Sequence, residues 1–202
     1  LNYQYSSNGY NVRVTGVYTN IMDQTDMMSF YDDSQNSFTN FAMCGIDQRH
    51  AGVELGFKIP FFLQGLSLEG AFSWGEYIYT SAPRMTQTID NSAEIVADNA
   101  LVPFWASHPV FKKNVVDGKT VYETDAEGDY VVDRWQKHYV PSTPQLAANL
   151  GFNYRTNSYW FFEIDAQYFA NSYLDMNPLY RTDMAVAGPD GIATPVEIEY
   201  MA

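Results

Sequence analysis

The chain has little cysteine, few basic residues and no long apolar run, and each shortage excludes a class of protein. Cys44 is the only cysteine among 202 residues, so no internal disulfide can form. Only 11 Lys and Arg stand against 24 Asp and Glu, and the formal net charge is −13. This balance argues against nucleic-acid binding, because phosphate recognition needs a basic surface. No run of about 18 apolar residues is present, which excludes a membrane-spanning helix but not a transmembrane strand.

The sequence motifs of common catalytic and metal sites are also missing. There is no HExxH, CxxC or GxSxG pattern, and His50, His108 and His138 are far apart in the chain. We therefore predict no enzyme, no catalytic residue, no metal and no cofactor. Two alternatives are less favoured. In the first, His108 and His138, which fall in one expected loop, would share a metal site there. In the second, His108 or His138 with Asp129 or Asp133 would be the catalytic pair of an outer-membrane hydrolase.

Aromatic residues and an apolar–polar alternation are abundant instead. Aromatics make up 16% of the chain, and both β-strands and membrane interfaces favour them. The clearest alternation sets Ala51, Val53, Leu55, Phe57 and Ile59 against Gly52, Glu54, Gly56 and Lys58. A period of two is typical of a strand with two different faces. The same pattern predicts six strands, at about 1–5, 10–21, 49–59, 66–80, 144–155 and 159–174.

The connections between these expected strands alternate between short and long. The short ones are 6–9, 60–65 and 156–158, and the long ones are at about 24–47, 81–142 and 175–202. Asn8-Gly9 and Asp117-Gly118 are strong signals for tight hairpins, the second of them inside the longest loop. Short turns on one side and long loops on the other are typical of outer-membrane β-barrels. We expect an all-β fold that forms part of a large antiparallel transmembrane β-barrel, with short periplasmic turns and long extracellular loops.

Alternation alone leaves another fold class open. The charged residues on the expected strands would face a wet lumen in a barrel, and would face bulk water in a soluble sandwich. A surface or secreted all-β binding module is therefore the main alternative. The chain begins inside an expected strand and stops without a closing one, and six strands are too few to close this kind of barrel. We expect residues 1–202 to be a fragment of a C-terminal β-barrel domain, incomplete at both ends.

Several stretches resemble TonB-dependent outer-membrane receptors of the Bacteroidetes kind. They are VPSTPQLAANLGFNYR at 140–155, YWFFEIDAQYF at 159–169 and YLDMNPLYRT at 173–182. Residues 18–25 and 45–55 resemble neighbouring strands of the same barrels. The resemblance lies in strand patterns and not in a catalytic signature. This chain contains no TonB box, no recognisable plug and no terminal strand that ends in an aromatic residue.

The resemblance implies a barrel of about 22 strands that is closed by an N-terminal plug and embedded in outer-membrane lipid. It implies active import of a scarce nutrient, such as an iron chelate, a cobalamin-like cofactor, an oligosaccharide or a peptide. The TonB energy-transducing complex would be a partner, and a surface lipoprotein over the mouth would be a second one. Ligand contact is expected in the outer loops and the upper lumen. The candidate ligand-binding residues are Tyr77, Asn171, Phe30, Tyr31, Phe104 and Trp105. The alternative role for the four loop aromatics among them, Phe30, Tyr31, Phe104 and Trp105, is to pack one loop against another.

Overall fold

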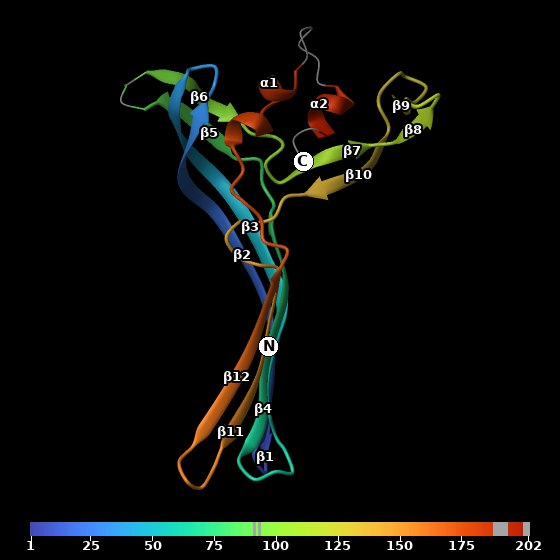
Figure 1. Ribbon diagram of the computed structural model, residues 1–202. Coiled ribbons are helices and arrows are strands. Elements are labelled where there is room, and N and C mark those ends of the chain that lie inside the picture. The colour runs from blue at the N-terminus through green and yellow to red at the C-terminus, as the bar shows by residue number, and fades with distance from the viewer. Residues whose placement is uncertain (91, 93, 188–193, 200–202) are drawn as a thin grey trace. The chain divides into compact units, whose positions relative to one another are not determined.

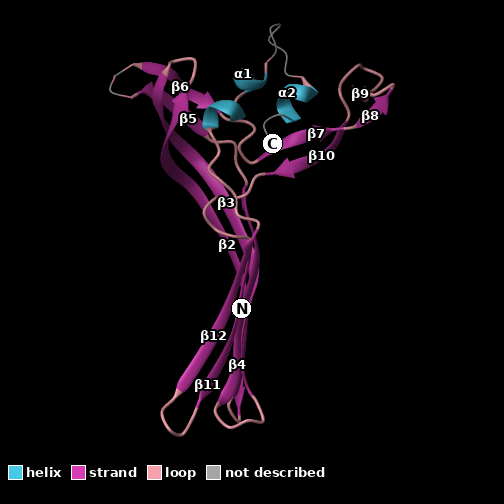
Figure 2. Cartoon of the chain, viewed as in Figure 1, coloured by secondary structure: helices cyan, strands magenta, loops and turns pink. Residues whose placement is uncertain are grey.

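The computed structural model describes residues 1–90, 92, 94–187 and 194–199, and it is almost entirely β-structure (Figures 1 and 2). Its strands pair in antiparallel fashion, so the prediction of an all-β antiparallel fold is confirmed at that level. The chain divides into two compact units. The sheet unit comprises Leu1–Asn20, Arg49–Tyr77 and Val140–Asp175, and the loop unit comprises Ile21–Gln48, Ile78–Tyr139 and Met176–Ala202.

Six strands follow one another in the main sheet. They are β1 (Asn2–Ser7), β2 (Tyr10–Asp32), β3 (Ser37–Pro60), β4 (Leu66–Tyr79), β11 (Leu146–Arg155) and β12 (Phe161–Ala170). Their order is β1-β2-β3-β4-β11-β12, so β4 pairs with a strand that lies far along the sequence. In the described residues β1 and β12 are the two edges of this path, and the sheet is open rather than closed.

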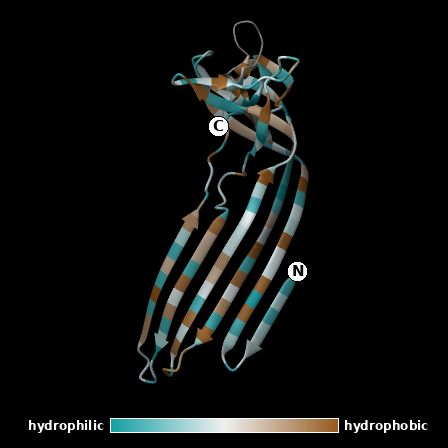
Figure 3. Cartoon of the chain, turned by 90° about the vertical axis from the view of Figure 1, so that its right-hand side faces the viewer, coloured by the Kyte–Doolittle hydropathy of each residue, from teal (hydrophilic) through white to brown (hydrophobic). Residues whose placement is uncertain are grey.

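The register of the sheet unit brings like residues together on each face. Phe72 of β4 lies opposite Ala148 of β11, which lies opposite Tyr168 of β12. One residue along, Ala71, Asn149 and Gln167 form the corresponding row on the other face. Hydrophobic and hydrophilic bands alternate along strands of this sheet (Figure 3). The two-residue period that predicted these strands also sets their faces.

The buried hydrophobic side chains all belong to the loop unit. They are Phe41, Met43, Ile46, Ile78, Tyr79, Met85, Val102, Trp105, Phe111, Val186 and Ile198. The sheet unit, all of whose residues are described, contributes none of them. It is therefore one layer of strands without a core of its own, whereas a domain in water normally packs two layers around a core.

The structure corrects the prediction of a long loop at 24–47. β2 continues to Asp32, β3 begins at Ser37, and only residues 33–36 form a turn. In β3 the burial alternates through Thr39, Phe41 and Met43, and β5 pairs along this part of the strand. The polar composition of 24–47 concealed this period, and tertiary pairing overrode the weak local preference.

The segment 81–142 contains six strands in three antiparallel pairings. They are β5 (Arg84–Ile89), β6 (Ile95–Leu101), β7 (Ser107–Phe111), β8 (Lys113–Val116), β9 (Lys119–Tyr122) and β10 (Val132–Lys137). β5 pairs with β6, β7 with β10, and β8 with β9. The predicted hairpin at Asp117-Gly118 is confirmed, and both residues have the positive φ angles, +50° and +74°, that such a turn requires.

Three short helices occupy the segment that was expected to be loop from 175 onward. They are η1 (Pro178–Arg181), α1 (Asp183–Val186) and α2 (Pro195–Glu199). Residues 188–193 of this expected loop lie outside the described residues. In the part of the chain that the structure describes, no helix is long and apolar enough to cross a membrane.

Candidate functional site

One face of the sheet unit carries a band of residues without a charged side chain, and this band is here called the apolar face. Alternation and register place on it Tyr3, Tyr5, Val12, Val14, Tyr18, Ala51, Val53, Leu55, Phe57, Ile59, Leu66, Leu68, Phe72, Trp74, Leu146, Ala148, Leu150, Phe152, Tyr154, Phe162, Ile164, Ala166 and Tyr168. Gly70 belongs to the same face, because a Cβ there would run into the ring of Phe57.

These apolar side chains are open to the surroundings. Ile164 is 74% exposed, Trp74 57% and Phe152 46%, although each is large and hydrophobic. Soluble monomers rarely expose continuous apolar patches of more than a few hundred Å². An uncharged face that spans six strands is therefore a candidate surface for contact with an apolar environment.

Polar and aromatic groups border the apolar face along the strands. Beyond Ala51 and Trp74, alternation puts Arg49 and Glu76 on the same side, and their side chains form an ion pair of 3.1 Å. Towards the short turns, the ring of Phe61 lies 6.3 Å from that of Phe152. The uncharged band is thus limited along the strand direction.

The opposite face of the sheet unit, here called the polar face, carries charges of both signs. Lys58 of β3 donates to the carboxylate of Glu69 on β4, and the hydroxyl of Ser67 donates to the same carboxylate over 3.2 Å. Arg13, Glu54, Glu163 and Asp165 lie on this face as well. A surface of this composition is suited to water or to a polar ligand, and not to hydrocarbon.

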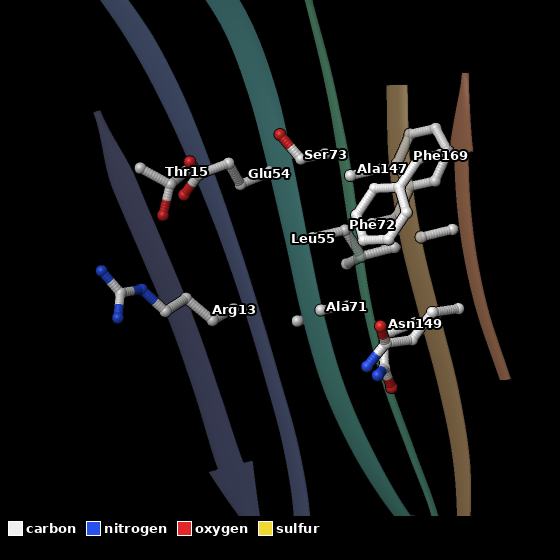
Figure 4. Close-up of a pocket in the computed structure, with 13 residues that line it drawn as sticks. Arg13, Thr15, Glu54, Leu55, Ala71, Phe72, Ser73, Ala147, Asn149 and Phe169 are labelled. Atoms are coloured by element: carbon white, nitrogen blue, oxygen red, sulfur yellow. The ribbon is translucent and has the colours of Figure 1, made fainter. Parts of the chain in front are cut away.

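The polar face contains an open hollow of about 410 Å³ (Figure 4). Its polar lining comes from four neighbouring strands and from β12: Arg13, Thr15, Glu54, Ser73, Asn149 and Gln167. Most of the wall is apolar, because Leu55, Phe72, Phe169 and three alanines also line the hollow. The lining thus offers a guanidinium, a carboxylate, two amides and two hydroxyls, which together donate and accept hydrogen bonds. The hollow therefore suits a ligand that has both hydrogen-bonding groups and an apolar surface.

Two of the sequence-predicted site residues lie in the sheet unit. The ring of Tyr77 lies over Gly75 and 4.9 Å from that of His50, and the Tyr77 backbone N–H donates to Gln145 Oε1 over 2.7 Å. Asn171 follows the end of β12 with φ of +57°, and its carbonyl accepts from the Gln145 backbone N–H. Neither residue lines the hollow.

The other four predicted residues lie in the loop unit and make aromatic contacts there. Phe30 meets Phe41 edge to face at 6.2 Å, and Tyr31 meets Phe38 at 5.4 Å while its hydroxyl donates to Asn36. These contacts join β2 to β3 across their hairpin. Packing within the hairpin is therefore one role of the rings of Phe30 and Tyr31.

Phe104 and Trp105 lie in a more densely packed part of the loop unit. Phe104 packs against a buried cluster of Phe111, Val186 and Ile198. Trp105 is almost wholly buried, and its ring lies 5.1 Å from that of Tyr79. A ligand would reach Trp105 only if its surroundings moved.

The structure brings His108 and His138 together inside the loop unit. His108 Nδ1 lies 2.7 Å from His138 Nε2, and His138 Nδ1 lies 2.9 Å from the carbonyl oxygen of Trp105. Burial is the main reason that the pKa of His138 falls to about 4, and the charge of Arg181 adds to it. Among the described residues no group of three or more His, Cys, Asp or Glu side chains is placed to hold a metal ion.

Comparison with known proteins adds no relative. No family model matches the chain, and neither a curated protein nor a solved structure matches it.

Sequence reasoning did not single out the residues of the hollow as a site. Arg13 and Glu54 each stand out as a charge on a strand, but the pairing of β4 with β11 is what places Ser73 beside Ala147 and Asn149 beside Ala71. These strands are separated by 66 residues of chain. A period-two pattern assigns a face to each strand, whereas it does not say which strands are neighbours.

Proposed function

We propose that this chain forms part of the wall and outer loops of an outer-membrane β-barrel transporter, of the TonB-dependent receptor kind. The observation that carries the proposal is the division of the sheet unit into an uncharged, exposed apolar face and a charged polar face. In a transmembrane barrel the first kind of face meets lipid and the second lines the lumen.

The dimensions of the strands are consistent with crossing a membrane. β11 and β12 have 10 residues each, and a tilted transmembrane strand needs about 9–11. Backbone groups in lipid must all be paired, which requires a closed sheet. The free edges of β1 and β12 would then pair with further strands of the barrel.

Lipid explains the apolar face better than water does. Moving one large apolar side chain from water to an apolar medium stabilises it by about 1.5–3 kcal/mol, and this face exposes many such side chains. In a soluble sandwich a second sheet would cover them at a distance of about 10 Å. Among the described residues no layer covers them, so a surface or secreted binding module is the second candidate and not the first.

The hollow on the polar face supports transport of a polar nutrient. Its mixed donors and acceptors would meet a solute that passes through the lumen, and its openness would allow that solute to leave again. Import against a gradient would need the TonB complex as energy source, and a surface lipoprotein would be a further partner at the mouth.

A matched pair of variants tests whether the apolar face meets lipid. Leu55→Arg places a charge on the apolar face and is expected to cost about 2–4 kcal/mol near the bilayer midplane, whereas Glu54→Arg changes only the polar face. Folding yield into lipid vesicles should fall for Leu55→Arg and stay close to the wild-type value for Glu54→Arg. Equal yields for the two variants would contradict a lipid-facing Leu55, and a protein that is soluble without detergent would favour the binding module.

A growth experiment tests transport itself. A strain that lacks the gene is supplied with one limiting nutrient at a time: an iron chelate, cobalamin, an oligosaccharide or a peptide mixture. We expect a growth defect on one class, which the wild-type gene restores and the Leu55→Arg gene does not. When TonB is also deleted, the strains with and without the gene should grow alike. Equal growth of both strains on every class in the presence of TonB would refute the transport function.

A further inference from the structure

A buried cation in the loop unit has no partner in the described structure. Arg181 ends η1, and its Nε and Nη1 atoms are buried without a hydrogen bond. Among the side chains that the structure describes, no carboxylate forms an ion pair with it. Burial lowers the pKa of Arg181, but a guanidinium keeps its proton in proteins. The charge therefore stays, and both of these N–H groups lack an acceptor.

A third unpartnered donor belongs to the same neighbourhood. The indole Nε1 of Trp105 is buried and makes no hydrogen bond. Two observations place Trp105 near Arg181. The backbone N–H of Phe104, the residue before Trp105, donates to the carbonyl of Arg181 over 3.2 Å. His138 contacts the carbonyl of Trp105, and the charge of Arg181 lowers the pKa of His138. All three unpartnered groups are donors.

The histidines cannot supply the missing negative charge. His138 Nδ1 must carry its proton to donate to the Trp105 carbonyl, so Nε2 is the acceptor and the ring is neutral. His108 Nδ1 then donates to His138 Nε2. This chain of hydrogen bonds fixes the tautomers, and neither ring carries a negative charge.

Buried donors without acceptors are costly, and a buried charge without a counter-charge costs several kcal/mol. An oxyanion removes both costs, because its oxygens accept from a guanidinium fork and from an indole N–H at once. We propose that Arg181 and Trp105 form a binding site for an oxyanion, which is a carboxylate or phosphate group of a ligand. Arg181 as a whole is partly exposed, whereas Trp105 is almost wholly buried, so an anion would reach the indole N–H only if the surroundings of Trp105 moved. This site does not depend on the proposed transport function and would stand in a binding module too.

Titration calorimetry of the complete gene product with inorganic phosphate, and separately with acetate, tests the site. We expect one of the two anions to bind, and the arm that binds tells a phosphate-bearing from a carboxylate-bearing ligand. Arg181→Gln should weaken that binding about tenfold or more, since it removes charge-assisted hydrogen bonds. Trp105→Phe removes one neutral donor and should weaken it by a smaller factor, about two- to tenfold.

Arg134→Gln is the matched control, because Arg134 is an exposed cation of the loop unit that pairs with its neighbour Asp133. Its affinity should equal that of the wild type. If Arg181→Gln does not fold, Arg181→Lys keeps the charge, loses the planar fork, and should still bind more weakly than the wild type. The proposal is overturned if neither anion binds the wild type, or if the Arg181 variants bind as tightly as Arg134→Gln.

Discussion

Acidification should loosen the part of the loop unit around His138, and the magnitude follows from its pKa. That pKa is about 4 in the folded chain, against an ordinary histidine value of 6.5, mainly because of burial. The unfolded segment therefore binds more protons between these values. The contribution to stability is fully present above pH 6.5 and is lost as the pH falls towards 4. Between pH 7 and pH 5 this amounts to about 2 kcal/mol, and to about 3 kcal/mol over the full range.

Hydrogen exchange at the backbone amide of His138 measures this loss, because that amide donates to the Ala106 carbonyl over 2.9 Å inside the loop unit. After correction for intrinsic exchange rates, its protection should fall about 20-fold from pH 7 to pH 5. The variant His138→Gln has no group that titrates there and should show little change. Equal pH dependence in the wild type and the variant would refute the reasoning, and so would constant protection in the wild type.

Two further predictions concern the topology and the packing of the strands. In intact cells, a cysteine placed at Asp117 in the β8–β9 hairpin should react with a membrane-impermeant reagent. A cysteine placed at Asn157 in a short turn should not react, because short turns are expected on the periplasmic side. The reverse labelling would contradict this topology. Gly70→Ala should destabilise the sheet by about 1–3 kcal/mol, because the new Cβ would meet the Phe57 ring. Gly56→Ala is the control, because a Cβ there meets open space and the change should be close to neutral. Equal denaturation midpoints for the two variants would contradict the close approach of β3 and β4.

Sequence periodicity predicted the strands of the sheet unit because their two faces carry different kinds of side chain. β3 from Ala51 to Ile59 and β11 from Leu146 to Tyr154 alternate strictly, and a strand with two unlike faces must do so. The same reasoning failed at 24–47, where Asp, Asn and Ser residues occupy strand positions and the burial of Phe41 and Met43 depends on pairing with β5.

The candidate sites were less accessible from sequence because they depend on long-range pairing. The hollow on the polar face requires the contact between β4 and β11, and the approach of His108 to His138 requires β7 to pair with β10. Nothing local marks Arg181 as a buried cation. Its environment is defined by Trp105 and His138, which come from distant parts of the chain.

The central claim is that one face of the sheet unit meets lipid and the other meets water, and β11 tests it most directly. Nitroxide labels are placed one at a time from Leu146 to Asn153 in the complete protein in lipid vesicles, and collisions with oxygen and with a water-soluble nickel complex are measured. Oxygen collisions should peak at Leu146, Ala148, Leu150 and Phe152, and nickel collisions at Ala147, Asn149, Gly151 and Asn153. Two profiles that rise and fall together, or an oxygen profile with no two-residue period, would contradict the account.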